Sequence, residues 1–186
     1  SLASLSVGNG EFAFTAGITG LQTFPKYYDG EGVSLGTQSH WGWHSLPNKN
    51  NYSLDELYKD YQVGDRKVPY IYRFGDEHPR KSRASEWLRE NPHRLHLGLI
   101  GLELEKENGE QTTIEDIQNP DQTLNLWTGQ LTSKFSFEDT PVNVQTLAHQ
   151  DLDMVSATIS SKLISQKKLK LKFRFPFGST DHVGPG

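Results

Sequence analysis

The sequence contains no cysteine, and this absence removes several kinds of chemistry at once. Disulfide bonds, thiolate nucleophiles, zinc sites with cysteine ligands and iron–sulfur clusters all require a thiol. The sequence also has no run close to the ~18 consecutive apolar residues of a membrane-spanning helix. It therefore predicts no membrane span. The lack of cysteine does not fix the compartment, because a protein of an oxidising compartment can manage without disulfides.

An excess of positive charge is also missing, since the net charge of the 186 residues is −4. A nucleic-acid-binding protein usually carries a basic field, so no nucleic-acid partner is predicted. The basic residues between Lys167 and Arg174 alternate with apolar ones, which is typical of an edge strand protected by lysines. Mean hydropathy is −0.65, yet aromatic residues reach 11% and supply large side chains for a core. The length fits one folded domain with long surface loops.

The second half of the chain shows the pattern of an antiparallel β-protein. Short apolar runs alternate with turn residues every ~8–12 positions, as in a strand meander within a β-sandwich. We therefore predict an all-β, mainly antiparallel fold, a supersandwich-like β-sandwich with one or two short helices in long loops. The expected strands of the meander are residues 123–128, 131–138, 142–149, 152–163 and 169–177.

Three local patterns give more detailed predictions. Ser53 and Glu56 form a capping box before apolar residues at helical spacing, which predicts a helix over residues 54–62. Asn108-Gly109 is typical of a hairpin turn and predicts that residues 101–107 pair with residues 110–117. The last run alternates Leu169, Leu171, Phe173, Phe175 and Phe177 with Lys and Arg, which predicts one buried face and one solvated face.

The most unusual stretch runs from Val33 to Asn48 and contains two of the four tryptophans. An extended chain would send Trp41 and Trp43 to the same face, with Gln38 and His44 nearby. Two indole rings bordered by an amide and an imidazole form an apolar platform with polar edges, which suits a sugar ring. The alternative is that both indoles belong to the core, because large aromatic residues dominate cores.

The remaining candidate chemistry has simpler explanations. Asp151 and Asp153 lie beside His149 in a tight connection, where aspartate is favoured for turn geometry. The spacing of His93 and His96 would point them to opposite faces of a strand, and no serine lies in a nucleophile elbow. We therefore predict no catalytic residues, no metal site and no cofactor.

Several segments together resemble a known group of enzyme domains. The chain is similar to the N-terminal β-sandwich of bacterial glycoside hydrolases and phosphorylases whose catalytic domain is a six-hairpin (α/α)6-barrel. Within that group, residues 20–24 and 37–44 resemble an uncharacterised branch. The resemblance extends over about Leu5–Gly178 and rests mainly on residues 7–14, 122–135, 142–149, 151–153 and 174–178.

The resemblance implies a supporting role. In such enzymes the catalytic carboxylates lie in the barrel, C-terminal to the sandwich, so this chain alone is expected to be non-catalytic. The expected partners are a carbohydrate and the C-terminal barrel of the same polypeptide, in a periplasmic or secreted bacterial glycosidase. Residues 1–178 would be the sandwich, with some last strands lacking, and 179–186 the start of a linker.

Gln38, Trp41, Trp43 and His44 are the candidate contacts at the rim of the sugar site. Two alternatives stay open: a free-standing carbohydrate-binding module, and a purely structural interaction domain.

Overall fold

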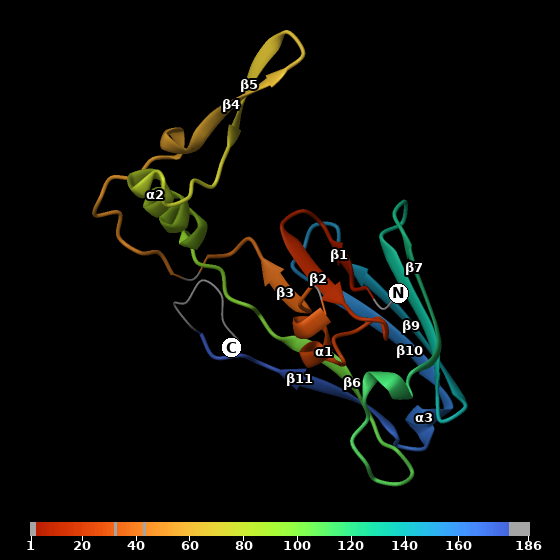
Figure 1. The fold of residues 1–186 in the computed structure, drawn as a ribbon. Coiled ribbons are helices and arrows are strands. Elements are labelled where there is room, and N and C mark those ends of the chain that lie inside the picture. The colour runs from red at the N-terminus through yellow and green to blue at the C-terminus, as the bar shows by residue number, and fades with distance from the viewer. Residues whose placement is uncertain (1–2, 32, 43, 179–186) are drawn as a thin grey trace. The chain divides into compact units, whose positions relative to one another are not determined.

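The computed structural model describes residues 3–31, 33–42 and 44–178 (Figure 1). Antiparallel strands dominate and the helices are few and short, which confirms the predicted all-β class. The chain divides into two compact units. The large unit comprises Ser1–His40 and His96–Phe177, and the inserted unit comprises Trp41–Leu95. No described helix is long and apolar enough to cross a membrane. The assignment of residues 1–178 to one domain stays a prediction.

The large unit contains three antiparallel sheets. Consecutive strands pair throughout the largest of them, because short turns join each strand to its neighbour, and this confirms the predicted meander from residue 123 to residue 161. The last strand predicted for the meander, residues 169–177, is wrong in its place, because β11 pairs with β6 instead. The sheets are β1(Leu5–Gly8), β2(Phe12–Ala16) and β3(Gly36–Ser39); β7(Gln118–Asn125), β8(Gln130–Phe137), β9(Thr140–Ala148) and β10(Val155–Ser161); and β6(Leu99–Leu104) with β11(Leu169–Arg174).

Alternating side chains build the core of the large unit. On β8, Leu131, Phe135 and Phe137 are buried while Lys134 is exposed, as expected of a strand with one covered face. Phe14 of β2 belongs to the same apolar cluster, as does Leu21 from the connection that follows β2. Three short helices complete this unit: α1(Pro25–Glu31), the 3-10 helix η2(Ile114–Asp116) and α3(Lys162–Ser165).

The predicted hairpin at Asn108-Gly109 is wrong in its pairing. The turn itself is present, with Gly109 at φ +75° and its amide bonded to the Lys106 carbonyl at 3.1 Å. However, β6 pairs with the distant strand β11, and Leu102 lies opposite Leu171. β6 and β11 match each other better than β6 matches residues 110–117, because both strands carry apolar residues on one face and opposite charges on the other. A local turn signal could not reveal that distant partner.

The apolar face of β11 is not covered as predicted. Leu169 is buried, but Leu171 is 49% exposed and the exposure rises to 89% at Phe177. We call Leu171, Phe173, Phe175 and Phe177 the exposed apolar row. The prediction of a buried face therefore holds for the first residue of β11 and is wrong for the rest of the run.

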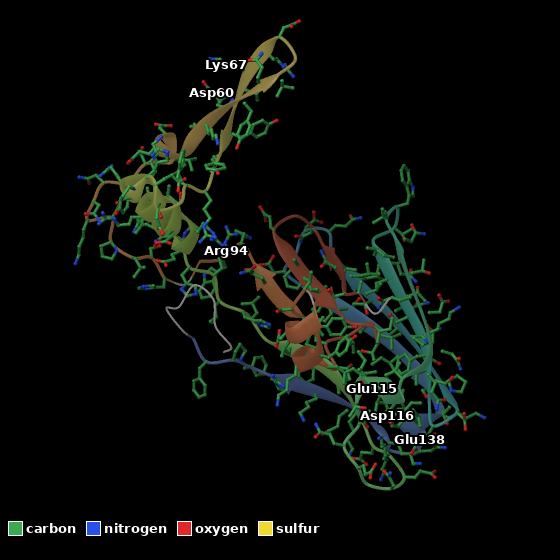
Figure 2. All side chains as sticks on the ribbon, viewed as in Figure 1. Asp60, Lys67, Arg94, Glu115, Asp116 and Glu138 are labelled. Atoms are coloured by element: carbon green, nitrogen blue, oxygen red, sulfur yellow. The ribbon has the colours of Figure 1, made fainter. Side chains whose placement is uncertain are left out.

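The inserted unit has a small core of its own, formed by Leu57, Phe74 and Ala84. Its elements are the 3-10 helix η1(Leu54–Leu57), β4(Tyr58–Val63), β5(Arg66–Ile71) and α2(Pro79–Glu90). The strands β4 and β5 form a hairpin from which Asp60 and Lys67 project (Figure 2).

The predicted helix over residues 54–62 is wrong after its first turn. The capping box of Ser53 and Glu56 is present, as expected, but it starts only a 3-10 turn. Residues 58–63 then pair with residues 66–71 around Gly64, whose φ is +58°. Tyrosine and valine favour strands, and the glycine supplies the left-handed turn, so pairing replaces the helix.

Candidate functional site

The candidate sugar-binding residues begin on β3, where alternation decides which side chains face solvent. Thr37 and Ser39 are buried and Gln38 between them is exposed. The Nε2 of Gln22 donates to the Thr37 hydroxyl at 3.2 Å, which ties β3 to the core of the large unit. Gln38 is therefore held on a strand with its amide directed to solvent, where it could donate to or accept from a sugar hydroxyl.

Trp41 and His44 belong to the inserted unit. Trp41 is 56% exposed, so the alternative that it is a core residue is wrong for this indole. His44 is half-buried and its carbonyl accepts a 2.8 Å hydrogen bond from the amide of His93. This β-bridge joins the entry of the inserted unit to its exit, as does a hydrogen bond from the Leu46 amide to Asn91.

The structure does not bring the four predicted residues together on one described body. Gln38 lies in the large unit, whereas Trp41 and His44 lie in the inserted unit. Trp43 lies outside the described residues. The predicted role of these residues in sugar binding therefore stays a prediction.

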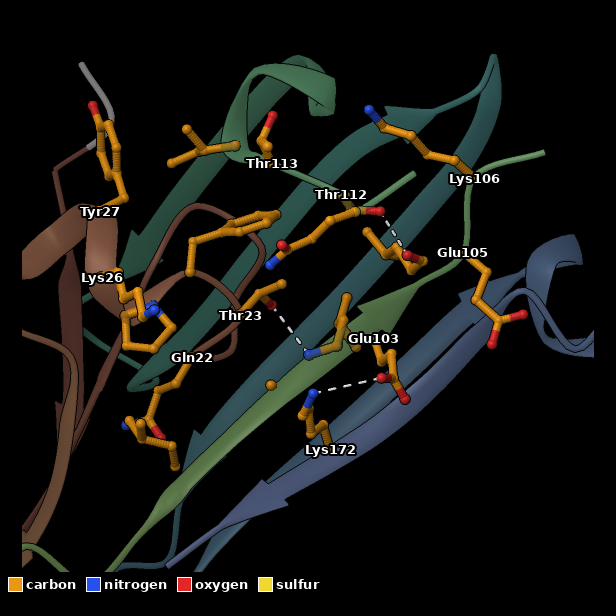
Figure 3. Close-up of a pocket in the computed structure, with 18 of the residues that line it drawn as sticks. Gln22, Thr23, Lys26, Tyr27, Glu103, Glu105, Lys106, Thr112, Thr113 and Lys172 are labelled. Atoms are coloured by element: carbon orange, nitrogen blue, oxygen red, sulfur yellow. Dashed lines mark hydrogen bonds and ion pairs between the residues drawn. The ribbon is translucent and has the colours of Figure 1, made fainter. Parts of the chain in front are cut away.

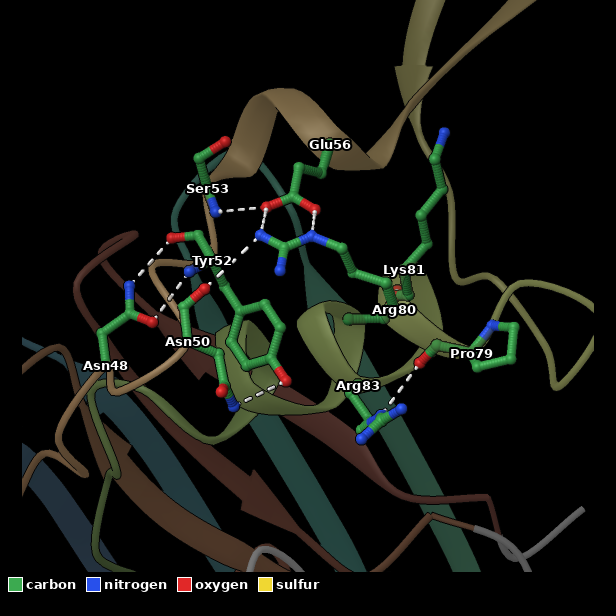
Figure 4. A network of polar contacts seen from close by, with 10 residues as sticks. Asn48, Asn50, Tyr52, Ser53, Glu56, Pro79, Arg80, Lys81 and Arg83 are labelled. Carbon is green, nitrogen blue, oxygen red and sulfur yellow. Dashed lines mark hydrogen bonds and ion pairs between the residues drawn. The ribbon is translucent and has the colours of Figure 1, made fainter.

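The segment that follows is fixed by a polar network (Figure 4). Asn48 bonds in both directions to the backbone of Tyr52, at 2.8 and 2.9 Å. The guanidinium of Arg80 donates to both oxygens of Glu56, at 2.7 and 2.8 Å. That bidentate pair connects η1 to α2 and so holds the small core of the inserted unit closed.

The same pair predicts a pH effect. Hydrogen bonds from Arg80 lower the pKa of Glu56, so the folded state favours the ionised carboxylate. A lowered pKa stabilises the fold above the ordinary glutamate pKa of about 4.3, and this contribution is lost as the pH falls through the folded value. We expect Glu56→Gln to lower the melting temperature at pH 7 and to change it much less near pH 3.

The control for this prediction is Glu86→Gln, which changes an exposed glutamate of α2. Glu86 forms no ion pair with any of the residues in the described ranges. The Glu86→Gln variant should have the melting temperature of the wild-type chain at both pH values. An equal effect of Glu56→Gln at both pH values would contradict the assigned role of the ion pair.

The carboxylates that the sequence brings close together lie in the connection between β9 and β10. His149 accepts through Nδ1 from the amides of Asp151 and Leu152, at 3.0 and 3.1 Å. Asn9 donates to the carbonyls of His149 and Leu152. These bonds hold Asp151 in a tight turn, as interpreted from the sequence, and Asp153 lies in the same short connection. In the part of the chain that the structure describes, no three His, Asp or Glu side chains gather as metal ligands would.

The sequence did not predict two surface features, an exposed hairpin and a groove. The β4–β5 hairpin exposes Tyr58, Tyr61 and Tyr70, and the helical prediction concealed it. The other is a groove on the large unit, lined by residues from distant parts of the sequence. Only the hairpin had a sequence signal, the Gly64-Asp65 turn. Comparison with known proteins gives no match to any family model, curated protein or solved structure.

Proposed function

We propose that this chain is a non-catalytic β-sandwich domain of a carbohydrate-active enzyme, a glycoside hydrolase of bacteria that acts in the periplasm or outside the cell. Its role is to dock against a helical (α/α)6-barrel of the same polypeptide and to contribute residues to the rim of the sugar site. The observation that carries the proposal is the exposed apolar row on and after β11.

The row has the properties of a docking surface. Phe173, Phe175 and Phe177 are all more than half exposed, and they follow one another at alternate positions. Contiguous apolar patches of this kind mark surfaces that another partner covers. The polar side of the same strand is already satisfied, because Lys170 and Lys172 pair with Glu105 and Glu103 of β6. Burial of the row therefore needs no rearrangement of charged groups.

The family resemblance supplies the identity of the partner. A helix carries an apolar stripe that packs on an apolar sheet face, which is a common two-layer arrangement. The barrel would provide the acid and base carboxylates. This division of labour accounts for a chain that offers an exposed apolar row and an exposed tryptophan.

The sugar contact is assigned to the residues around Trp41. Its exposed indole would stack on the C–H face of a sugar ring, while Gln38 and His44 would bind hydroxyl groups. Trp43 is part of the same proposal from its sequence position. The second candidate function is a free-standing carbohydrate-binding module, which the exposure of Trp41 also favours.

Tryptophan fluorescence during titration with oligosaccharides tests the sugar contact. With the barrel attached, we expect a quench and a spectral shift that are lost in Trp41→Ala. The matched control is Trp127→Ala, which removes an indole that is 96% exposed in the turn between β7 and β8. That variant should keep the response.

A response that survives Trp41→Ala would contradict the assignment of the rim to this residue. A response of the chain alone would favour the binding module, whereas one that appears only with the barrel attached would favour the rim of an enzyme.

A further inference from the structure

The large unit carries an open groove of about 780 Å³ between β6 and the segment of residues 22–27 (Figure 3). Phe24 and Tyr27, at the start of α1, border the groove on one side, and the loop that follows β6 borders it on another. Glu103 of β6 and Lys172 of β11 lie on adjacent strands along it. The volume is within the range of about 300–1,000 Å³ that small-molecule sites usually have.

A close backbone approach fixes the shape of the groove. A side chain at Gly101 would lie 2.7 Å from the carbonyl oxygen of Gln22, so only glycine fits there. The amide of Gln22 donates to the Ile100 carbonyl at 2.7 Å, and the hydroxyl of Thr23 accepts from Leu102 at 3.1 Å. The segment before α1 is thus bonded to β6, and the groove is a preformed feature of the fold.

The charges in the groove balance one another. Lys172 lies 3.5 Å from Glu103, and Lys106 lies 2.8 Å from Asp116. Glu105 accepts a hydrogen bond from Lys170. The lining residues carry four basic groups (Lys26, Lys106, Lys172 and Arg174) and four acidic groups (Glu103, Glu105, Glu110 and Glu115), so the groove has no excess formal charge of either sign to attract an ion. Hydrogen-bond acceptors and donors are instead mixed along the groove. This mixture suits a ligand with many hydroxyl groups, because each hydroxyl can both donate and accept a hydrogen bond.

Aromatic and amide side chains complete this chemistry. Phe24 and Tyr27 are half-buried against the core and still border the groove, so their rings are held in place. Gln111 is exposed on the opposite loop and forms no hydrogen bond with any other described residue. Aromatic rings and an amide that line the same groove can together stack on a sugar ring and bind its hydroxyl groups.

We propose that this groove is a second carbohydrate site, on the large unit, and that it binds a neutral oligosaccharide. The inference rests on the proposed function only for the class of ligand, because the groove itself is independent of Trp41. Such a site would hold a polymeric substrate at a place other than the rim. Binding at two places on one chain would raise the overall affinity through the higher effective concentration of the second site.

Isothermal titration calorimetry of this chain tests the proposal with a panel of neutral tetrasaccharides and an oligogalacturonate. Gln111→Trp places a large side chain in the groove without removing a core contact or a hydrogen bond. We expect it to weaken neutral oligosaccharide binding by at least about tenfold, equivalent to ~1.4 kcal/mol. The matched control is Gln145→Trp, an exposed position of β9 that does not line this groove, which should leave the affinity unchanged.

The Trp41→Ala variant separates the groove from the rim. Binding that survives Trp41→Ala and is lost in Gln111→Trp supports the groove. Binding lost in Trp41→Ala and unchanged in Gln111→Trp overturns the groove and leaves the proposed function standing. Absence of heat with every neutral tetrasaccharide, or a preference for the oligogalacturonate, also overturns the proposed site. Melting curves of each variant confirm that a loss of binding is not a loss of fold.

Discussion

Phe137→Ala is expected to lower the free energy of unfolding by about 3–5 kcal/mol, the usual cost of removing a buried phenylalanine. The ring of Phe137 is fully buried in the core of the large unit, among residues of several strands. Its removal would leave a cavity that the paired strands on both sides cannot fill. Chemical denaturation measured by circular dichroism gives the change.

The matched control is Phe177→Ala, which makes the same chemical change at a side chain that is 89% exposed. Substitutions at such positions usually change stability by less than about 0.5 kcal/mol. The pair therefore tests the finding that only the first residue of β11 enters the core. Equal losses for the two variants would show that the exposed apolar row is buried in solution.

Gly20→Ala is the second change for which we expect a large effect, about 2–5 kcal/mol in total. Gly20 has φ +77°, where an L-residue costs about 1–2 kcal/mol. A methyl group there would also lie 2.9 Å from the Ser133 hydroxyl and 3.0 Å from Val144, and overpacking of this kind costs about 1–3 kcal/mol. The carbonyl of Gly20 accepts from Thr146 at 2.7 Å, so the turn cannot move away freely.

Gly129→Ala separates the two causes of this loss. Gly129 has a similar φ of +68°, but nothing lies within 4 Å of the added carbon. Only the backbone cost of about 1–2 kcal/mol should remain. Urea denaturation of both variants measures the difference. If Gly129→Ala is as destabilising as Gly20→Ala, the contacts of the Gly20 turn with β8 and β9 are not the source of the lost stability.

The sequence predicted the strand pairings of the meander, which join segments adjacent in the chain. The strands β7 to β10 follow one another along the chain, so alternation and turn residues were enough to predict their meander. Pairing of β6 with β11 spans more than sixty residues, and no local signal reports it. The helix predicted from residue 54 failed for a similar reason, because the pairing of β4 with β5 outweighed the helical spacing of Leu54, Leu57, Tyr58 and Tyr61.

The candidate site was predictable only in part. The exposed tryptophan could be proposed from the sequence because aromatic and polar residues are adjacent there. The position of this tryptophan at the start of an inserted unit could not be predicted, because the unit is closed by a contact between the distant residues His44 and His93. The groove on the large unit is assembled from residues around Phe24, Glu103, Gln111 and Lys172, and no spacing in the sequence connects them.

The central claim is that a partner domain covers the exposed apolar row. Carbene labelling with mass spectrometry measures the accessibility of Phe173, Phe175 and Phe177 in this chain alone and in this chain joined to the proposed barrel. Trp127 serves as an internal reference, because it is 96% exposed and lies outside the row. We expect strong labelling of the row in this chain alone and much weaker labelling when the proposed barrel is attached, with Trp127 unchanged. Equal labelling of the row in both proteins would contradict the claim.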